Sequence, residues 1–366
     1  MQKLVLFLAL LGLTTSTYAQ KTKVKTKGPA ALAATMQDRR WSAEKANAWY
    51  KAHPWMTGAN FAPSTAINQL EMWQADTFDP TTIDRELGWA EGIGFNTMRV
   101  FLHSVAWQQD PKGFKDRVNT YLGIADKHHI QTILVFFDDC WNKVPQAGPQ
   151  PAPKPGIHNS GWMQDPGDPA SRDSATFVKL KPYVQDVLAS FRNDKRILLW
   201  DLYNEPGNNG KGTSSLPLVR NVFGWAREIN PAQPLSVGLW NWEFEALNQY
   251  QILHSDVVTY HNYDEAPAHQ RVIELLKTHG RPLICTEYMA RPRNSRFVNI
   301  LPLLKKQNVG AINWGLVDGK TNTKYQWDVP IADGSEPMEW FHEVFRKDGT
   351  PYHQDETDLI KKLSGR

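Results

Sequence analysis

From Trp55 onward, the sequence alternates eight times between a short apolar run and a longer segment with helical spacing. Short runs rich in β-branched and aromatic residues are typical of buried strands, and apolar residues three or four apart are typical of amphipathic helices. The apolar runs are, in order, WMTGANF, FNTMRVFL, QTILVFF, ILLWDLY, PLSVGLW, VVTYHNY, PLICTEY and VGAINWGLV. This alternation predicts a parallel sheet closed into a (β/α)8 barrel (TIM barrel), with a doubly wound open sheet as the alternative.

Helices are expected between these runs. The segments with helical spacing are TTIDRELGWAEGIG, FKDRVNTYLGIADKHH, FVKLKPYVQDVLASFRND, LVRNVFGWAREIN, HQRVIELLKTHG and VNILPLLKKQ, with PMEWFHEVFRK after the last strand. Before the first strand, Ser42 is placed to cap a short helix in SAEKANAWYKA.

The amino-terminal residues read as a secretory signal. MQKLVLFLALLGLTTSTYAQ has a lysine, an apolar core and small residues that predict cleavage after Ala19. We therefore expect residues 1–19 to be a signal peptide, 20–40 a basic flexible leader, 41–352 the barrel domain and 353–366 a carboxyl-terminal tail. The expected location is periplasmic or secreted.

Composition excludes several classes of protein. The 41 basic and 38 acidic side chains nearly balance, which argues against a nucleic-acid partner. After the signal, no apolar run approaches the roughly 18 residues that a membrane span needs. Cys140 and Cys285 are the only cysteines, too few for a disulfide scaffold, and their pairing stays open.

One connection is unusually long. Residues 141–172 follow the third predicted strand and are too rich in proline for regular structure. In a barrel this segment leaves the carboxyl ends of the strands, where active sites are built. Trp162 within it either shapes a substrate cleft or belongs to a solvent-exposed loop without a role.

Two predicted strands end on a glutamate. Because side chains alternate along a strand, Asp201, Tyr203 and Glu205 share one face, and Cys285 and Glu287 share another. The fourth and seventh strands thus each bring one glutamate to the same rim. Taken singly, such glutamates are usually solvated or paired with arginine. Taken together, two carboxyl groups about 5 Å apart are the arrangement with which retaining glycosidases cleave a sugar acetal.

The order of further residues resembles clan A glycoside hydrolases, and most closely family 5, the cellulase family. The resemblance covers about residues 55–352 and lies at separate positions in the expected strand order. The matching residues are Arg99 on the second strand, Asn204 and Glu205 on the fourth, His261 and Tyr263 on the sixth, Glu287 on the seventh and Trp314 on the eighth.

The resemblance implies a role for each member of the acid pair. Glu205 would be the general acid and base, with a raised pKa and with His261 beside it to help pass the proton. Glu287 would be the nucleophile, kept ionised because Arg99 lowers its pKa and Tyr263 donates a hydrogen bond to it.

The resemblance also implies substrate contacts. Asn204 would bind the sugar 2-hydroxyl, and Trp314 would stack on the pyranose ring. A purely structural role stays open for three of these residues. Arg99 could form a buried ion pair with Asp201, His261 could be a core histidine, and Trp314 could fill the barrel interior.

One position departs from the family pattern. A histidine is typical near the end of the third strand, where this chain has Asp138 and Asp139. Either aspartate is placed to contact a sugar hydroxyl or to cap the following turn. Several tryptophans fall at predicted rim positions, among them Trp107 and Trp240, the latter a candidate sugar contact.

The leading hypothesis is a secreted retaining β-glycosidase that acts on a polysaccharide or its oligosaccharides and needs no cofactor or metal. A carbohydrate substrate is the only partner expected, and the oligomeric state is left open. A carbohydrate-binding barrel without catalysis is the first alternative. A metal-dependent hydrolase with His261, Asp138 and Glu287 as ligands is the second, although the usual metal-binding spacings are missing.

Overall fold

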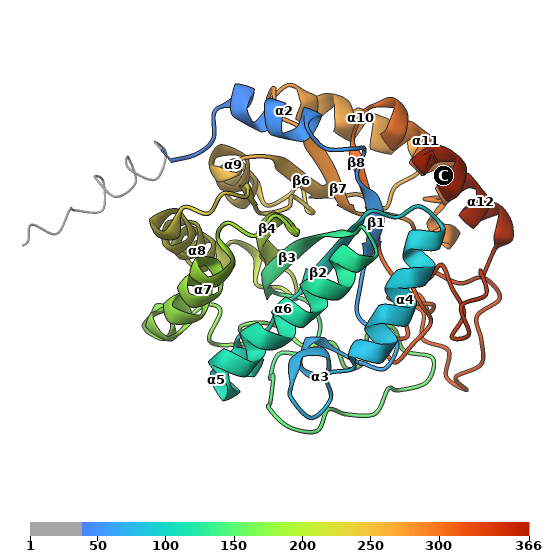
Figure 1. Ribbon diagram of the computed structural model, residues 1–366, viewed down its shortest axis with the longest axis horizontal. Coiled ribbons are helices and arrows are strands. Elements are labelled where there is room, and N and C mark those ends of the chain that lie inside the picture. Colours follow the sequence, from blue (N-terminus) through green and yellow to red (C-terminus); the bar gives the residue numbers. More distant parts are fainter. Residues whose placement is uncertain (1–38, 366) are drawn as a thin grey trace, which may run out of the picture.

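The computed structural model describes residues 39–365 and contains eight parallel strands surrounded by helices (Figure 1). The strands are β1 (Thr57–Asn60), β2 (Thr97–Phe101), β3 (Gln131–Asp138), β4 (Ile197–Asn204), β5 (Leu235–Ser236), β6 (Val258–His261), β7 (Leu283–Glu287) and β8 (Gly310–Asn313). Each coincides with one of the eight apolar runs of the sequence, although β3 and β4 each extend one polar residue beyond their run. The predicted (β/α)8 barrel is confirmed, and the open-sheet alternative is wrong.

The sheet closes on itself. Its strand order is β5-β4-β3-β2-β1-β8-β7-β6, with every neighbouring pair parallel. After β5, Leu239 forms a parallel bridge with Tyr260 of β6, and the amide of Leu239 donates to the carbonyl oxygen of Thr259. This bridge, three residues after the end of the short β5, completes the barrel.

Most of the helices lie outside the strands and surround them (Figure 1). They are α2 (Ala43–Lys51), α3 (Gln69–Trp73), α4 (Pro80–Gly92), α5 (Ser104–Gln109), α6 (Pro111–Lys127), α7 (Phe177–Phe191), α8 (Leu216–Ile229), α9 (Glu245–His254), α10 (Ala266–Lys277), α11 (Phe297–Lys306) and α12 (Gln354–Ser364). α2 begins as predicted, because the Ser42 hydroxyl accepts from the amide of Lys45. α9 was not predicted from the sequence.

The main core fills the space between the sheet and the helices. A second cluster joins Trp41, Ala46 and Tyr50 to residues at the amino-terminal ends of the strands, among them Ile133 and Ile312. α2 therefore covers the bottom of the barrel. Each large apolar side chain buried in this way contributes roughly 1.5–3 kcal/mol.

The helix predicted in PMEWFHEVFRK is wrong: residues 337–347 form bends and turns. The reason is the buried side chain of Arg291, which lies after β7. Its guanidinium donates to the carbonyl oxygens of Trp340, His342 and Glu343. These carbonyls are therefore satisfied by a distant side chain instead of by helical amides.

The predicted tail is instead a helix of the barrel wall. α12 packs on α11 at the end of the chain (Figure 1), with Ile360 fully buried. Glu356 on α12 forms an ion pair of 2.6 Å with Arg291. α12 thus takes the place expected for the helix after β8, and the barrel domain extends past residue 352.

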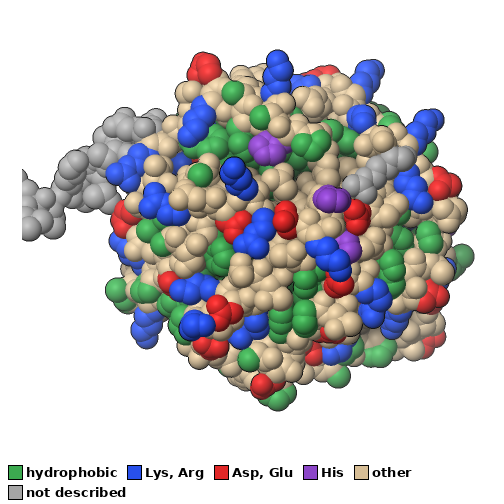
Figure 2. Space-filling view, viewed as in Figure 1, with side chains coloured by type: hydrophobic (Ala, Val, Ile, Leu, Met, Phe, Trp, Pro, Cys, Tyr) green, Lys and Arg blue, Asp and Glu red, His purple; other side chains and the backbone are tan. Residues whose placement is uncertain are grey.

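The expected signal peptide lies outside the described residues, as does the leader except for Arg39 and Arg40. Arg40 donates to the carbonyl oxygens of Ser255 and Ile252. Within residues 39–365, no helix is both long and apolar enough to cross a bilayer. Basic and acidic side chains are interspersed over the face seen in Figure 2, in line with the balanced composition.

Candidate active site

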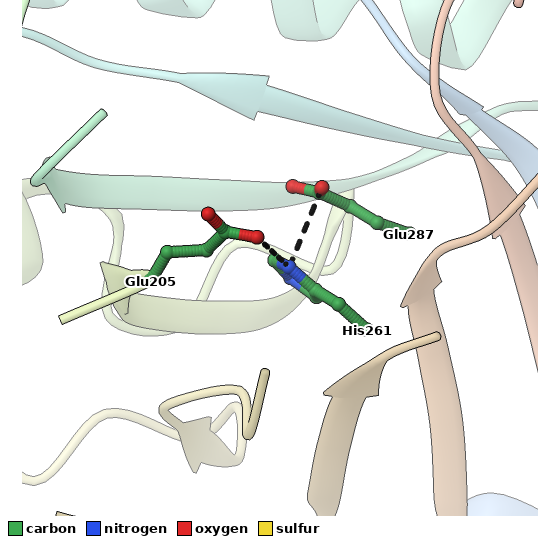
Figure 3. A group of neighbouring side chains, drawn as sticks. All are labelled: Glu205, His261 and Glu287. Atoms are coloured by element: carbon green, nitrogen blue, oxygen red, sulfur yellow. Dashed lines mark hydrogen bonds and ion pairs between the residues drawn. The ribbon is translucent and has the colours of Figure 1, made fainter. Parts of the chain in front are cut away.

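Glu205 and Glu287 face each other across the carboxyl end of the barrel, with His261 between them (Figure 3). Glu205 follows β4, Glu287 ends β7 and His261 ends β6. One carboxylate oxygen of each glutamate and one ring nitrogen of His261 all lie within 4.8 Å of one another. The sequence therefore placed the pair correctly at one rim, because parallel strands end at the same edge of the sheet.

Glu287 is held by a buried cation. Arg99 on β2 donates to its Oε1 at 2.9 Å, and the Tyr263 hydroxyl donates to its Oε2 at 2.9 Å. Arg99 also bonds Asp201 at 2.8 Å and the Asn204 side-chain oxygen at 2.7 Å. Both predictions for Arg99 therefore hold at once, since it pairs with Asp201 and with Glu287. The network fixes the orientation of the Glu287 carboxylate.

Glu205 has neutral partners instead. The Cys140 thiol lies 3.2 Å from its Oε2, the Asn208 amide donates to the same oxygen at 2.6 Å, and His261 Nδ1 lies 2.8 Å from its Oε1. The backbone of Glu205 has a φ of 44°, in the left-handed region that residues other than glycine rarely adopt. This turn at the end of β4 directs the carboxyl toward Glu287 and brings Asn208 beneath it.

Burial raises the pKa of both carboxyls. For Glu287 the pKa rises to about 7, since burial and the charge of Glu205 outweigh His261 and Arg99. Arg99 lowers the pKa of Glu287 as expected, but burial and the charge of Glu205 outweigh it, so the net shift is upward. For Glu205 burial raises the pKa against the hydrogen bonds from Cys140 and Asn208. Because Arg99 contacts only Glu287 of the two, the negative charge is favoured on Glu287 and the proton on Glu205.

His261 is neutral near pH 7, because burial lowers its pKa to about 4. Its Nδ1 lies 2.8 Å from Glu205 and 3.3 Å from Glu287. A neutral imidazole that contacts both carboxyls is placed to move a proton without adding a fixed charge.

The glutamates open into a cavity of about 730 Å³. Trp314 lines it, packed edge-on against Trp162 and Phe101. Trp240 also lines it, anchored by a hydrogen bond from its Nε1 to the Pro206 carbonyl. Asn204, His261 and Tyr263, which were also predicted as site residues, line the cavity as well.

The two aspartates after β3 lie in different places. Asp138 lines the cavity, but its oxygens accept from the Asn204 amide at 2.9 Å and the Trp162 indole at 2.7 Å. It therefore positions these two side chains, and burial raises its pKa to about 6.

Asp139 does not line the cavity. It accepts from the Tyr203 hydroxyl, the Ser215 hydroxyl and the Gly207 amide, and it forms a buried ion pair of 2.6 Å with Lys211. The structure therefore places Asp139 where it anchors the segment after β4, away from any sugar. Its four donors leave no oxygen directed at the cavity.

Several cavity residues were not predicted as site residues. Cys140, Asn208 and Trp327 line it, whereas Trp107, predicted at the rim, bonds Asp186 on α7. Asn208 lies three residues after Glu205, so the polar run after β4 was a usable signal. Trp327 lies in the long segment after β8, far along the chain from any strand end, where no comparable signal marks a site.

The residues of the metal hypothesis do not meet as proposed. Within residues 39–365, one group of side chains lies close enough to hold a metal ion, and it consists of Glu205, His261 and Glu287. Asp138 is not part of it, because its oxygens bond Asn204, Trp162 and the Cys140 amide. In this group Arg99 already supplies a positive charge to Glu287.

Cys140→Ala is expected to shift the alkaline limb of the activity profile to higher pH. A thiol that donates to the Glu205 carboxylate stabilises the ionised form, so its loss raises the pKa of Glu205. At the optimum, kcat/KM should fall by no more than about tenfold, because one hydrogen bond contributes roughly 1 kcal/mol. Profiles of kcat/KM against pH on an aryl β-glycoside measure both effects.

Cys140→Ser is the matched control, since its hydroxyl keeps a donor at this position. Its alkaline limb should stay near that of the unaltered enzyme. An unmoved limb in Cys140→Ala would show that the thiol does not influence Glu205. Both cysteines are free, and Cys285 lies on β7 with its thiol against the Glu287 carbonyl.

A closed (β/α)8 barrel with a buried acid pair at its carboxyl rim is the class to which glycoside hydrolases of clan A belong. The sequence model of the cellulase family (glycosyl hydrolase family 5) matches residues 90–320, well over half of the chain. The chain therefore belongs to glycosyl hydrolase family 5, and the resemblance noted in the sequence is confirmed. No curated protein is similar enough in sequence to count as a match.

Solved structures share the fold at low sequence identity. An endo-beta-1,4-mannanase from Thermotoga petrophila has a TM-score of 0.55 at 15% identity, over 85% of this chain and 76% of that one. GH5_18 from Streptomyces cattleya has a TM-score of 0.59 at 12% identity, over 86% and 80%. An exo-beta-1,4-mannosidase from an Opitutaceae bacterium has a TM-score of 0.59 at 16% identity, over 85% and 59%.

Proposed function

We propose that this protein is a retaining β-glycosidase with Glu287 as nucleophile and Glu205 as acid and base. The observation that carries the proposal is the separation of the two carboxyls, whose nearest oxygens lie within 4.8 Å. Retaining enzymes place these groups about 5 Å apart, whereas inverting enzymes leave about 6.5–9.5 Å for a water molecule.

The first step forms a glycosyl ester. The Glu287 carboxylate attacks the anomeric carbon, the bond to the glycosidic oxygen breaks, and that oxygen takes the proton of Glu205. Arg99 and Tyr263 hold Glu287 in position for the attack. Asn204, fixed by Arg99 and Asp138, offers its amide to the sugar 2-hydroxyl, and Trp314 supports the ring.

The second step releases the sugar. Glu205, now ionised, takes a proton from water while the water oxygen attacks the anomeric carbon and the ester bond breaks. Glu287 returns as a carboxylate and Glu205 is protonated again. Two displacements at the same carbon leave the anomeric configuration unchanged. His261, neutral and in contact with both carboxyls, assists the return of the proton.

A β-linked glycan is the proposed substrate, and family membership supports a carbohydrate. Among the similar solved structures, one is named an endo-beta-1,4-mannanase and one an exo-beta-1,4-mannosidase. A third is in complex with Manβ1-4GlcNAc. We therefore propose β-1,4-mannosides as the first substrates to test. Tryptophans around the cavity, such as Trp141 and Trp240, offer flat apolar surfaces for sugar rings.

The stereochemistry of the product tests the mechanism. Hydrolysis of an aryl β-mannoside or β-glucoside, followed by proton NMR from the first minutes, is expected to show the β-anomer before it equilibrates. Initial release of the α-anomer would overturn the double displacement. Binding of glycans without any turnover would instead favour a carbohydrate-binding barrel.

Secretion is proposed on the signal at residues 1–19 alone. Expression of the whole chain in a bacterial host, followed by amino-terminal sequencing of the exported protein, should give Gln20 as the first residue. Retention of the intact chain in the cytoplasm would contradict it.

A further inference from the structure

The long segment after β3 is hydrogen-bonded to the segment after β8 beside the cavity. The amide of Asn159 donates to the Thr321 carbonyl at 2.8 Å, and the amide of Ile331 donates to the Gly156 carbonyl at 3.0 Å. His158 Nδ1 donates to the carbonyl oxygen of Tyr325 at 2.8 Å. Residues 156–159 and 321–331 form what we call the end wall.

The backbones of the two segments of the end wall lie very close to each other at Gly156. Gly156 has a φ of 73°, and a Cβ at this position would lie 1.9 Å from the carbonyl oxygen of Ile331. Only glycine fits both the backbone angle and the contact.

The same segment also lies against α3, which follows β1. Asn68 and Gln69 donate to the carbonyl oxygens of Gly161 and Met163 at 2.8 and 3.0 Å. Figure 1 shows the long connection after β3 passing beside α3. The segments after β1, β3 and β8 are therefore hydrogen-bonded to one another, and those after β3 and β8 line one side of the cavity with residues that include Asn159 and Trp327.

The other side of the cavity is more exposed. It is lined by residues after β4 and β5, including Trp240 and Trp242, and the side chain of Trp242 is 42% exposed. In the closed strand order, β8 and β1 lie across the barrel from β4 and β5. The cavity thus has an open side next to Glu205 and a closed side opposite to it.

This asymmetry fixes the direction of the substrate. The general acid protonates the oxygen of the departing sugar, so the leaving part of the chain lies on the side of Glu205. The sugar that reacts with Glu287 then extends the other way, toward the end wall. The end wall therefore meets the non-reducing end of the glycan.

Asn159 offers hydrogen-bonding groups for the sugar at that end. Its side chain lines the cavity and is 1% exposed. Neither its amide nitrogen nor its side-chain oxygen has a hydrogen-bond partner among residues 39–365. A buried amide with both functions unpaired is costly unless a ligand satisfies it. A sugar hydroxyl both donates and accepts, and so matches both atoms.

From the closed end and the unpaired amide, we infer that the enzyme cleaves from chain ends: Asn159 binds the terminal non-reducing sugar against the end wall. This inference rests on the proposed function and adds the mode of cleavage and a specificity residue. An internal stretch of a polysaccharide cannot continue past the wall, whereas a chain end fits against it.

The product pattern tests the closed end without any substitution. The probes are β-1,4-mannopentaose, cellopentaose and xylopentaose, each labelled at the reducing end. Chain-end cleavage should shorten the labelled fragment by one fixed step at a time from the earliest samples. Labelled fragments of several lengths appearing together would overturn the inference while leaving the glycosidase assignment intact. Absence of hydrolysis of these probes and of aryl β-glycosides would overturn both.

Asn159→Gly tests the residue itself. Asn159 has a φ of 46°, which glycine adopts freely, so the substitution removes the amide without straining the backbone. We expect kcat/KM on the accepted pentaose to fall about 10- to 100-fold, as for the loss of two hydrogen bonds. The melting temperature should stay unchanged.

Asn308→Gly is the matched control. Asn308 has a similar φ of 53° but is exposed in the turn before β8, at the opposite end of the barrel. It should keep the kcat/KM of the unaltered enzyme. An Asn159→Gly enzyme as active as Asn308→Gly would overturn the role of Asn159.

Discussion

Glu287→Ala is expected to lower kcat on an aryl β-glycoside by on the order of 10⁵-fold, or about 7 kcal/mol of activation free energy. The substitution removes the atom that forms the glycosyl ester, and no other carboxylate among residues 39–365 is placed against the same carbon. Glu205, with an oxygen within 4.8 Å of a Glu287 oxygen, is on the side of the leaving group in the proposed mechanism. Steady-state rates with a dinitrophenyl β-glycoside measure the loss, because that leaving group needs no acid.

The configuration of the product formed with azide shows on which face of the sugar the carboxylate has been removed. In Glu287→Ala it should enter the vacated space, attack the anomeric carbon and displace the aryl group, which gives the α-glycosyl azide. Glu274→Ala, an exposed glutamate on α10, is the control and should keep full activity. Near-normal turnover in Glu287→Ala would remove Glu287 from the mechanism.

The barrel itself follows from local pattern. All eight strands coincide with apolar runs, because a strand buried on both faces is mostly apolar along its length. The meeting of Glu205 and Glu287 also follows, because side-chain alternation and a common rim fix both ends. These are properties that short stretches of sequence specify by themselves.

The alternation of side chains along a strand also predicts different positions for Asp138 and Asp139 at the end of β3. Neighbouring residues in a strand point to opposite sides, so only one of Asp138 and Asp139 faces the cavity. Of the two, only Asp138 could therefore have been expected to contact a sugar hydroxyl. The ion pair between Asp139 and Lys211 could not be predicted from the sequence, because it depends on how the segment after β4 folds.

Other contacts depend on backbone angles that sequence pattern does not give. Cys140 and Asn208 reach Glu205 because the chain turns at Glu205 with a φ of 44°. The non-helical path of residues 337–347 depends on Arg291, almost fifty residues earlier in the chain. The pKa of Glu287 depends on how completely the site is buried, and that outweighs the nearby cation.

Glu205→Ala is expected to affect substrates according to their leaving groups. On an oligosaccharide, whose leaving alkoxide needs a proton, kcat/KM should fall about 10²- to 10⁴-fold. On a dinitrophenyl β-glycoside, kcat/KM should change little, since the first step proceeds without an acid. The second step still needs a base, so the glycosyl ester should accumulate and release of the phenolate should show a burst followed by a slow phase.

The pH profile and azide complete the test. Burial raises the pKa of Glu205, so the unaltered enzyme stays active above the range of an ordinary carboxylic acid and loses activity as Glu205 deprotonates. In Glu205→Ala this alkaline limb should vanish. Azide attacks the glycosyl ester without base and should give the β-glycosyl azide, opposite in configuration to the product of Glu287→Ala. The same anomer from both variants would show that the two glutamates do not act on opposite faces of the sugar.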